Sequence, residues 1–382
     1  MSTQPRILCI SFSNILADSR VLRQLEVLKR FGAVTTIGYG QAPPGVVEHL
    51  EVDSSLRSLP QTPLGVLKLA ARAFRSADLD APAMRRALEL VDGRQFDLIV
   101  ANEARALPLA HHISGGAPIW GDMHEWAPQE RTHVLSWRLL VAPFMTSVCA
   151  RYLPLTSAIS TVNGSIARLY KEQFGVESRI VRNAIAFQDL APSPLLDGRI
   201  RLVHSGGAVP GRSIETLIEA TKRLDDRFSL DLYLVKAIGS DSYWESLVRL
   251  AAESDRVHVH DPVSPAALPG VLNAYDLGVY VLPPRTTNHK LMLPNKFFDF
   301  VQARLGLVFS SAVETDALIH AHDLGRVSEG FGVDGLVAAL EGLSADDVAR
   351  FKANAHSAAA VLNSREDERV EEDILTELLA RR

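Results

Sequence analysis

The sequence predicts an α/β protein made of two doubly wound domains in tandem. Its 382 residues exceed the length of one ordinary domain. In both halves short apolar runs alternate with helical patterns, which is typical of parallel sheets covered by helices. A stretch rich in proline and glycine at 191–198 has no periodicity and is typical of a linker. We therefore expect domains at 1–190 and 200–364, a linker at 191–199 and a C-terminal helix at 365–382.

The composition indicates a globular protein, with 47% hydrophobic and 22% charged residues. A formal net charge of -5 argues against broad binding to nucleic acid. The two cysteines, Cys9 and Cys149, are expected to be reduced thiols, and no Cys or His cluster has metal-ligand spacing. The N-terminus leads directly into an apolar strand, and no apolar run reaches the ~18 residues of a membrane span. We expect a cytoplasmic protein, either soluble or peripheral at the inner face of the membrane.

The first half opens with an apolar run at 7–12 that predicts a buried strand. A helical pattern begins near Asp18, and we expect Gly32 to end that helix in a left-handed cap. Further strands are predicted at 34–37, 96–101 and 117–122. Ligands of such domains bind at the carboxyl ends of the strands, which directs attention to the residues that follow each run.

The second half restarts the pattern with a strand at 201–205 and a glycine-rich turn at 206–211. Further strands are predicted at 230–235, 257–260, 277–281 and 307–310. Glycines let backbone N–H groups approach a diphosphate, and the helix that follows offers its positive end. Arg212 stands at the start of that helix, where it could bind phosphate oxygens. The alternative is a tight turn with a solvated arginine.

A second motif follows Pro294, where Phe297, Phe298 and Val301 form the buried side of a short predicted helix. Lys296 and Asp299 are three residues apart and share a face of that helix. A cation at a helix N-terminus suits a diphosphate, and a carboxylate can accept hydrogen bonds from ribose hydroxyls. A surface ion pair is the alternative.

Several short segments in both halves follow one common pattern. They are Asp18-Ser19-Arg20-Val21, Asp122-Met123-His124-Glu125, Val181-Arg182-Asn183-Ala184, His204-Ser205-Gly206-Gly207, Asp261-Pro262-Val263 and Pro294-Asn295-Lys296-Phe297-Phe298-Asp299. Together they resemble the GT-B glycosyltransferases, close to the family 4 group, over nearly the whole chain. The resemblance implies two Rossmann-like domains facing across a cleft. It also implies donor binding in the C-terminal domain, acceptor binding in the N-terminal domain, and transfer without a metal ion or other cofactor.

Carried over residue by residue, the resemblance implies a donor site in which Arg212 and Lys296 hold the diphosphate and Asp299 holds the ribose. The complete expected donor-binding set is Gly206, Gly207, Arg212, Pro262, Val263, Asn295, Lys296, Asp299, Ser310 and Glu314. Pro262 and Val263 would meet the base edge, and Ser310 and Glu314 are expected in a loop after the last strand. Leu291 stands where many relatives have a glutamate, so one contact to the donor sugar is missing.

The same resemblance places His124 against the transferred sugar. Retention of the anomeric configuration is favoured, and an inverting reaction would need Glu125, Asp122 or Glu103 as its base. The expected catalytic set is His124, Glu125 and Asp122, and the expected acceptor-side set is Asn14, Asp18 and Glu103.

Three further stretches need an interpretation. The run 66–77 predicts a surface helix packed on its domain, with an interfacial helix on acidic lipid as the alternative. The run 137–152 predicts buried core, with an acceptor groove or a membrane-facing patch as the alternative. Asp78-Leu79-Asp80 we interpret as a solvated loop.

The sequence thus predicts a glycosyltransferase of polysaccharide or glycoconjugate biosynthesis that uses a UDP- or GDP-linked sugar. Its acceptor would be a hydroxyl of a glycan, a glycolipid or a small molecule. A nucleotide-sugar epimerase of the same fold and a non-catalytic nucleotide-sugar sensor or scaffold are the alternatives.

Overall fold

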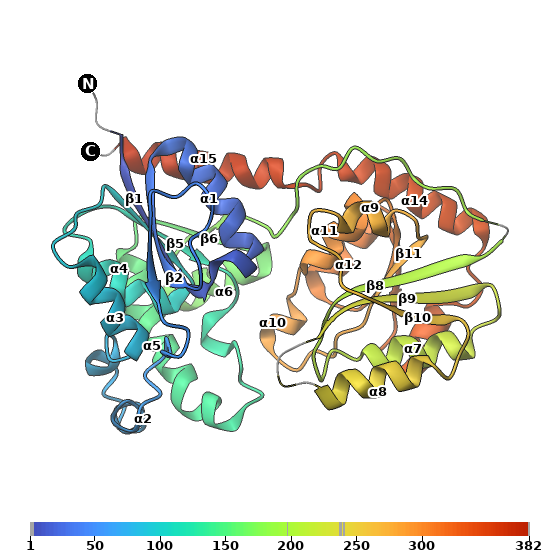
Figure 1. The fold of residues 1–382 in the computed structure, drawn as a ribbon, viewed down its shortest axis with the longest axis horizontal. Coiled ribbons are helices and arrows are strands. Elements are labelled where there is room, and N and C mark those ends of the chain that lie inside the picture. The colour runs from blue at the N-terminus through green and yellow to red at the C-terminus, as the bar shows by residue number, and fades with distance from the viewer. Residues whose placement is uncertain (1–3, 197, 237–238, 240, 381–382) are drawn as a thin grey trace. The chain divides into compact units, whose positions relative to one another are not determined.

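The computed structural model describes residues 4–196, 198–236, 239 and 241–380, and the chain divides into two compact units (Figure 1). The N-terminal unit holds residues 1–182, 286–288 and 366–382, and the C-terminal unit holds 183–285 and 289–365. Two predictions used residues that lie outside the described ranges. Residues 1–3 belong to the N-terminus that was predicted to lead directly into a strand, and Asp197 belongs to the predicted linker.

In the N-terminal unit, the described residues form a parallel sheet of seven strands in the order β3-β2-β1-β4-β5-β6-β7. The strands are β1 (Arg6–Asn14), β2 (Ala33–Tyr39), β3 (Glu48–Val52), β4 (Leu98–Asn102), β5 (Ile119–Met123), β6 (Ala158–Thr161) and β7 (Arg179–Ile180). The strand order reverses between β1 and β4, which creates a switch point at their carboxyl ends. Asn14 and Asn102 therefore mark the edge of the sheet where a ligand of this unit is expected to bind.

Helices cover both faces of this sheet. They are α1 (Ser19–Phe31), α2 (Pro63–Ala70), α3 (Pro82–Val91), α4 (Leu107–Ile113), α5 (Ala142–Tyr152), α6 (Gly164–Phe174) and α15 (Ser364–Leu379). Short 3-10 turns lie at η1 (Ile15–Ala17), η2 (Phe74–Ala77), η3 (Ala104–Ala106), η4 (Ala127–Gln129) and η6 (Leu153–Leu155), and η5 (Trp137–Val141) is a π-helical turn. Ile374, Leu375 and Leu378 of α15 are buried in one apolar cluster with Ile7 of β1 and Val21 of α1. The last helix of the chain therefore completes the core of the first unit.

The C-terminal unit has a parallel sheet of six strands among its described residues, in the order β10-β9-β8-β11-β12-β13. The strands are β8 (Ile200–Ala208), β9 (Phe228–Lys236), β10 (Val257–His260), β11 (Leu277–Tyr280), β12 (Gly306–Ser310) and β13 (Gly325–Ser328). The helices are α7 (Ile214–Arg223), α8 (Asp241–Ala251), α9 (Leu268–Leu272), α11 (Asn295–Gln302), α12 (Val313–Ala321), α13 (Val333–Leu340) and α14 (Ala345–Ala359), and the short α10 (Thr287–Lys290) has residues in both units. Two apolar clusters make up its core. The sheet again switches order, here between β8 and β11.

Two local predictions about glycine were wrong. Gly32 follows α1 with extended backbone (φ -169°) and not in a left-handed cap. A Cβ at that position would lie 2.4 Å from the carbonyl oxygen of Pro5, so close packing and not a positive φ explains the glycine. The expected turn at 206–211 begins later, because Gly206 and Gly207 continue β8 and pair with Leu234 and Val235 of β9.

Candidate functional site

Cationic side chains gather at the carboxyl end of β8 in the C-terminal unit. Gly206 has a φ of +141°, and a Cβ on it would lie 2.5 Å from the ammonium nitrogen of Lys296. Lys296 comes from the first turn of α11, and its Nζ lies 5.4 Å from the centroid of the Tyr280 ring. The glycine therefore leaves the space that the lysine occupies, and no other residue would fit both the backbone and that space.

The charge on this group of side chains is only partly compensated. Burial, together with the nearby Arg212 guanidinium, lowers the pKa of Lys296 to about 8, and Asp299 opposes that shift. Burial and the charge of Lys296 lower the pKa of His204 to about 3. His204 is thus neutral at pH 7, and its Nδ1 donates to the carbonyl of Val279 at 2.9 Å. Two cations that repel each other in a confined place are well suited to bind a polyanion.

A third cation approaches the turn between β8 and α7. Gly211 has a φ of +87°, and a Cβ on it would lie 2.7 Å from Nη1 of Arg285. Ser213 also adopts a positive φ, of 53°, immediately before α7 begins. The turn thus carries exposed Arg212 at a helix N-terminus with Arg285 beside it. Arg285 is not among the predicted donor-site residues, although its place in the loop after β11, at the carboxyl end of a strand, was a signal that could have identified it.

The remaining donor-side predictions fall in varied surroundings. Asp299 lies one turn after Lys296, and Asn295 is exposed at the start of α11. The Oγ atom of Ser310 is buried and accepts a hydrogen bond from the backbone N–H of Leu282 at 3.0 Å. Ser310 and Glu314 were predicted to lie in a loop after the last strand of the sheet. Glu314 lies instead in the first turn of α12, and β12 is not the last strand because β13 follows it, so both parts of this prediction were wrong.

Pro262 and Val263 follow β10, which β9 separates from β8 in the sheet. Pro262 is exposed and Val263 is half-buried, as is Leu291 ahead of α11. These positions are compatible with contact to the far end of an extended ligand whose phosphates lie near β8.

In the N-terminal unit, His124 follows β5 and is held by the neighbouring strand. Its Nε2 lies 3.0 Å from the amide oxygen of Asn102, and its Nδ1 lies 3.9 Å from a carboxylate oxygen of Glu103. The amide nitrogen of Asn102 donates to Gln24 at 3.0 Å, which fixes the amide orientation. Since an amide oxygen only accepts, Nε2 of His124 carries the proton.

Asp122 is buried beneath this histidine with no exposed surface. Its carboxylate accepts from the Arg20 guanidinium at 2.7 and 2.8 Å and from the hydroxyl of Ser160 at 2.6 Å. Although burial opposes ionisation, the Arg20 charge and the hydrogen bonds hold the pKa of Asp122 below its usual range. Because the Asp122 carboxylate is fully enclosed, we expect it to hold Arg20 and His124 in position and not to contact a substrate.

Three carboxyl groups surround Arg105 beside His124. Burial, followed by the charges of Glu130 and Glu103, raises the pKa of Glu125 to about 8. Nε of Arg105 lies 2.5 Å from Glu103, and its Nη2 lies 3.4 Å from Glu130. These side chains line a cavity of about 10 Å³, which is close to the space that one water needs. A carboxyl group with such a pKa can donate a proton near neutral pH and accept one above it.

Glu103 itself has an unusual backbone, with a φ of +65°. Its N–H donates to the carbonyl of Asp122 at 2.8 Å, so the neighbouring strand end holds this strained conformation. Arg105 and Glu130 did not appear among the predicted site residues, because only the fold brings them to Glu103 and Glu125.

Asn14 and Asp18, the other expected acceptor-side residues, lie at the end of β1 and the start of α1. Asn14 is exposed, and a Cβ on Gly40 would lie 2.8 Å from its side-chain oxygen. Asp18 caps α1, where its carboxylate accepts from the N–H of Val21 at 3.2 Å. That hydrogen bond gives Asp18 a structural role of its own.

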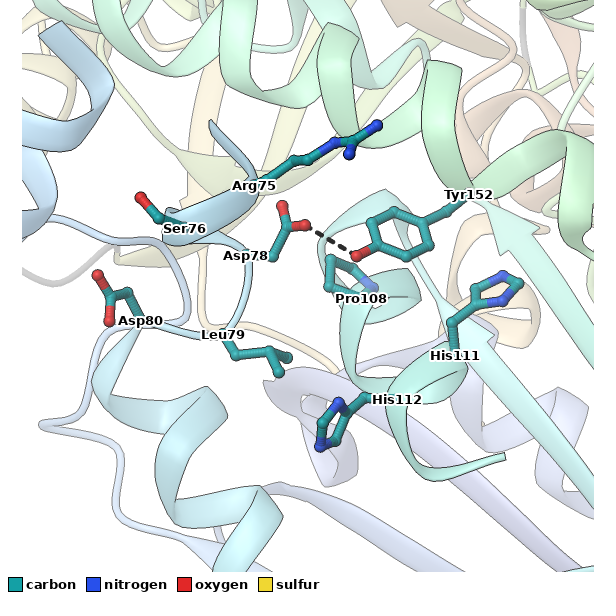
Figure 2. Close-up of a pocket in the computed structure, with 9 residues that line it drawn as sticks. All are labelled: Arg75, Ser76, Asp78, Leu79, Asp80, Pro108, His111, His112 and Tyr152. Carbon is teal, nitrogen blue, oxygen red and sulfur yellow. Dashed lines mark hydrogen bonds between the residues drawn. The ribbon is translucent and has the colours of Figure 1, made fainter. Parts of the chain in front are cut away.

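A pocket of about 350 Å³ lies elsewhere in the N-terminal unit, around Asp78 (Figure 2). The interpretation of Asp78-Leu79-Asp80 as a solvated loop was wrong, because Asp78 is only 7% exposed. Its carboxylate accepts from Arg151 at 2.6 Å and from the Tyr152 hydroxyl at 2.8 Å, and Asp80 pairs with Arg85 at 2.5 Å. Within the described ranges, no group of His, Cys, Asp and Glu is arranged to hold a metal ion.

Comparisons with solved structures identify the fold. A structure of Anabaena HepE in complex with UDP-glucose matches with a TM-score of 0.68 and 15% identity, and the match covers 98% of this chain and 100% of that one. Sucrose-phosphate synthase from Thermosynechococcus elongatus matches with a TM-score of 0.73 and 13% identity over 99% of this chain and 100% of that one. A glycosyltransferase from Rickettsia africae matches with a TM-score of 0.67 and 12% identity over 99% of both chains.

The chain therefore has the α/β fold of the GT-B glycosyltransferases, as the sequence predicted. No family model matches the sequence, and no curated protein matches it. Among the described residues, no helix is long and apolar enough to cross a membrane.

Proposed function

We propose that the chain is a glycosyltransferase that takes its sugar from a nucleoside-diphosphate donor bound by the C-terminal unit. The observation that carries this proposal is the Lys296 ammonium group seated against Gly206 with Arg212 nearby. A diphosphate placed there would neutralise both cations. The same cations would stabilise the negative charge that grows on the leaving nucleoside diphosphate. HepE, which shares the fold, is seen with UDP-glucose, and this supports a UDP-linked donor, with a GDP-linked one as the alternative.

The donor would contact several elements of the C-terminal unit. Arg285 joins Lys296 and Arg212 on the diphosphate, and Gly206, which has no Cβ, leaves the space that the Lys296 ammonium group occupies there. Asp299 would accept from the ribose hydroxyls. The set is completed by Asn295, Pro262, Val263, Ser310 and Glu314, of which the buried Ser310 would act indirectly, because its Oγ accepts from the backbone N–H of Leu282 and so positions that segment.

The acceptor would be a hydroxyl of a glycan, a glycolipid or a small molecule bound at the strand ends of the N-terminal unit. His124 would face the transferred sugar, with Glu125 and Glu103 as the carboxyl groups nearest to it. Asn14 and Asp18 would lie on the acceptor side, and Asp122 would hold His124 in place. Because fixed cations take the electrostatic role of a divalent ion, we propose transfer without a metal, as in the family 4 group. We propose retention of configuration from the resemblance to that group alone.

Thermal unfolding with a panel of nucleoside diphosphates and their sugars tests the donor site. A ligand at 100 times its Kd should add about 2.7 kcal/mol to stability, which is a visible shift. Lys296→Met, which should weaken binding about ten- to hundredfold, should cut that gain to about 0.4–1.4 kcal/mol, whereas the exposed Lys290→Met should keep it. If no nucleotide stabilises the protein, or if both variants respond alike, the assignment of the donor site fails.

Turnover then separates the classes of function. Slow release of the nucleoside diphosphate from the donor, unaffected by EDTA, supports a metal-independent transferase. Donor binding with no release would instead favour a sensor, which the apolar Leu291 is compatible with. Formation of an altered free sugar would favour an epimerase.

A further inference from the structure

An apolar surface lies on the N-terminal unit, where α2 packs against η5. Its exposed members are Leu64, Val66 and Leu67 of α2 with Leu135 and Leu139 at η5, and their exposed fractions run from 39% for Val66 to 64% for Leu67. The prediction of a helix through 66–77 was only partly right, since α2 ends at Ala70. We call these five side chains the leucine face.

The two parts of the leucine face are physically joined. A guanidinium nitrogen of Arg72, just after α2, donates to the carbonyl of Leu139 at 3.1 Å. A pocket of about 320 Å³ lies between the two elements, with Val66 and Leu69 on one side and Trp137 on the other. Figure 1 shows α2 and α5, which continues η5, at the same end of the unit. They thus form one surface and not two separate ones.

Among the described residues, unpaired positive charges accompany the leucine face, whereas the acidic side chains at the ends of its two stretches, Asp78, Asp80 and Glu130, are paired with cations. Residues 54–77 carry four basic residues and residues 131–152 carry three, and neither stretch has an aspartate or glutamate, although the whole chain has a net charge of -5. In the part of the chain that the structure describes, none of four exposed arginines forms an ion pair with a carboxylate. These arginines are Arg72, Arg75, Arg131 and Arg138. Exposed guanidinium groups that no described carboxylate neutralises, beside exposed leucines, form an amphipathic, cationic surface.

We propose that the leucine face docks the N-terminal unit onto an anionic lipid bilayer. A bilayer of this kind supplies an apolar layer for the leucines and a negative surface for the arginines in one partner. A second copy of the chain would bring arginines against arginines, because an isologous contact pairs the same patch with itself. A hydrophilic acidic peptide would neutralise the arginines but leave the leucines exposed to water. Docking here does not depend on the donor chemistry, and it would bring a glycolipid acceptor to the same surface.

Co-sedimentation with vesicles tests the proposal directly. The full chain should bind vesicles that contain phosphatidylglycerol at least about tenfold better than vesicles of phosphatidylcholine alone, since each arginine near an anionic surface contributes about fivefold. Leu67→Glu should weaken that binding about tenfold. The double variant Arg75→Glu/Arg138→Glu should weaken it about 25-fold or more.

Matched substitutions far along the chain serve as controls. Val361 is 54% exposed in the C-terminal unit, so Val361→Glu adds the same charge at a similar exposure without touching the leucine face. Arg199→Glu/Arg249→Glu matches the double variant, because both arginines are exposed there. We expect the control variants to bind vesicles like the native chain. If they lose as much binding as the variants of the leucine face, the proposal is overturned.

Three other results would also overturn it. They are absence of vesicle binding, equal binding to neutral and anionic vesicles, and self-association in solution that Leu67→Glu abolishes, which would make the face a dimer contact. Circular dichroism verifies that each variant is folded. Donor release measured without lipid should be unchanged in Leu67→Glu, so failure of docking is distinguishable from failure of the proposed transferase activity.

Discussion

Replacement of Lys296 by methionine should change stability and nucleotide affinity in opposite directions. The half-buried ammonium group has a pKa of about 8, against 10.5 for an ordinary lysine, because of burial and the Arg212 charge. This difference corresponds to about 3 kcal/mol that the folded state loses by keeping the lysine charged. Methionine fills similar space without the charge, so the unliganded variant should be more stable by up to that amount.

The pH dependence has a definite sign. Between pH 8 and 10.5 the unfolded chain binds more protons at Lys296 than the folded chain, so native stability rises with pH in that window. The advantage of Lys296→Met should therefore be complete below pH 8 and should vanish above pH 10.5. For a unit of this size each kcal/mol shifts the melting temperature by about 2–4 °C.

Nucleotide binding should show the reverse. A hydrogen bond to a charged group contributes about 1.5–3 kcal/mol, so Lys296→Met should weaken nucleoside diphosphate binding about ten- to hundredfold. In the native protein, affinity should fall about tenfold from pH 7 to pH 9, as Lys296 loses its proton. Calorimetric titration across this range measures both effects. If Lys296→Met is neither more stable without ligand nor weaker in nucleoside diphosphate binding, then the Lys296 ammonium group does not lie in a confined anion site.

Three further substitutions test the geometry of both units. Gly206→Ala should destabilise the protein by about 1–3 kcal/mol and abolish nucleotide binding, since its Cβ would displace Lys296; chemical denaturation and titration measure the two losses. Asp122→Asn should cost about 3–5 kcal/mol in denaturant unfolding, because it leaves the Arg20 guanidinium buried without its countercharge. Glu125→Gln should flatten an inflection near pH 8 in turnover at saturating donor, where the loss of affinity through Lys296 no longer contributes, and a profile that keeps its inflection would assign it to another group.

The sequence was most informative about buried strands. Runs such as 7–12 and 307–310 are apolar on both faces, because a strand in the middle of a parallel sheet contacts helices on each side. Strands β3, β6, β7 and β13 were missed. Three of them lie at the edges of their sheets, and the fourth, β6, lies between β5 and β7 but is only four residues long and half polar (Ala158–Thr161). An edge strand is only partly covered, so Glu48–Val52 alternates polar and apolar residues and lacks the continuous run that predicts a strand.

The residues of the candidate sites were predictable where they are close in sequence and were not predictable where only the fold brings them together. Lys296 and Asp299 were predictable because one helical turn holds both, and a motif of consecutive residues records that arrangement. The partners of Asp122 were not predictable in this way, since Arg20 lies 102 residues away in the chain. Arg285 reaches its site from a loop and Arg105 from the short 3-10 turn η3, and the local sequence of neither segment encodes what these side chains contact.

Glu371 tests whether a side chain of the last helix, α15, interacts electrostatically with Asp122, which lies beneath His124. It is 5% exposed on α15, and burial followed by the negative charge of Asp122 raises its pKa to about 8, with Arg20 opposing. The folded chain therefore binds more protons than the unfolded chain between pH 4.5 and 8, so the contribution of Glu371 to stability falls as pH rises through that window.

Glu371→Gln keeps the shape and the neutral state of this side chain but does not titrate. Its stability relative to the native protein should rise by about 1.4 kcal/mol per pH unit between pH 5 and pH 8 and level off above that. Denaturant unfolding at several pH values measures the difference, with Asp373→Asn at an exposed position of α15 as the control. A constant difference would mean that Glu371 is already ionised in the folded protein, and that α15 contributes to the N-terminal unit through Ile374, Leu375 and Leu378 without acting on the charge of Asp122.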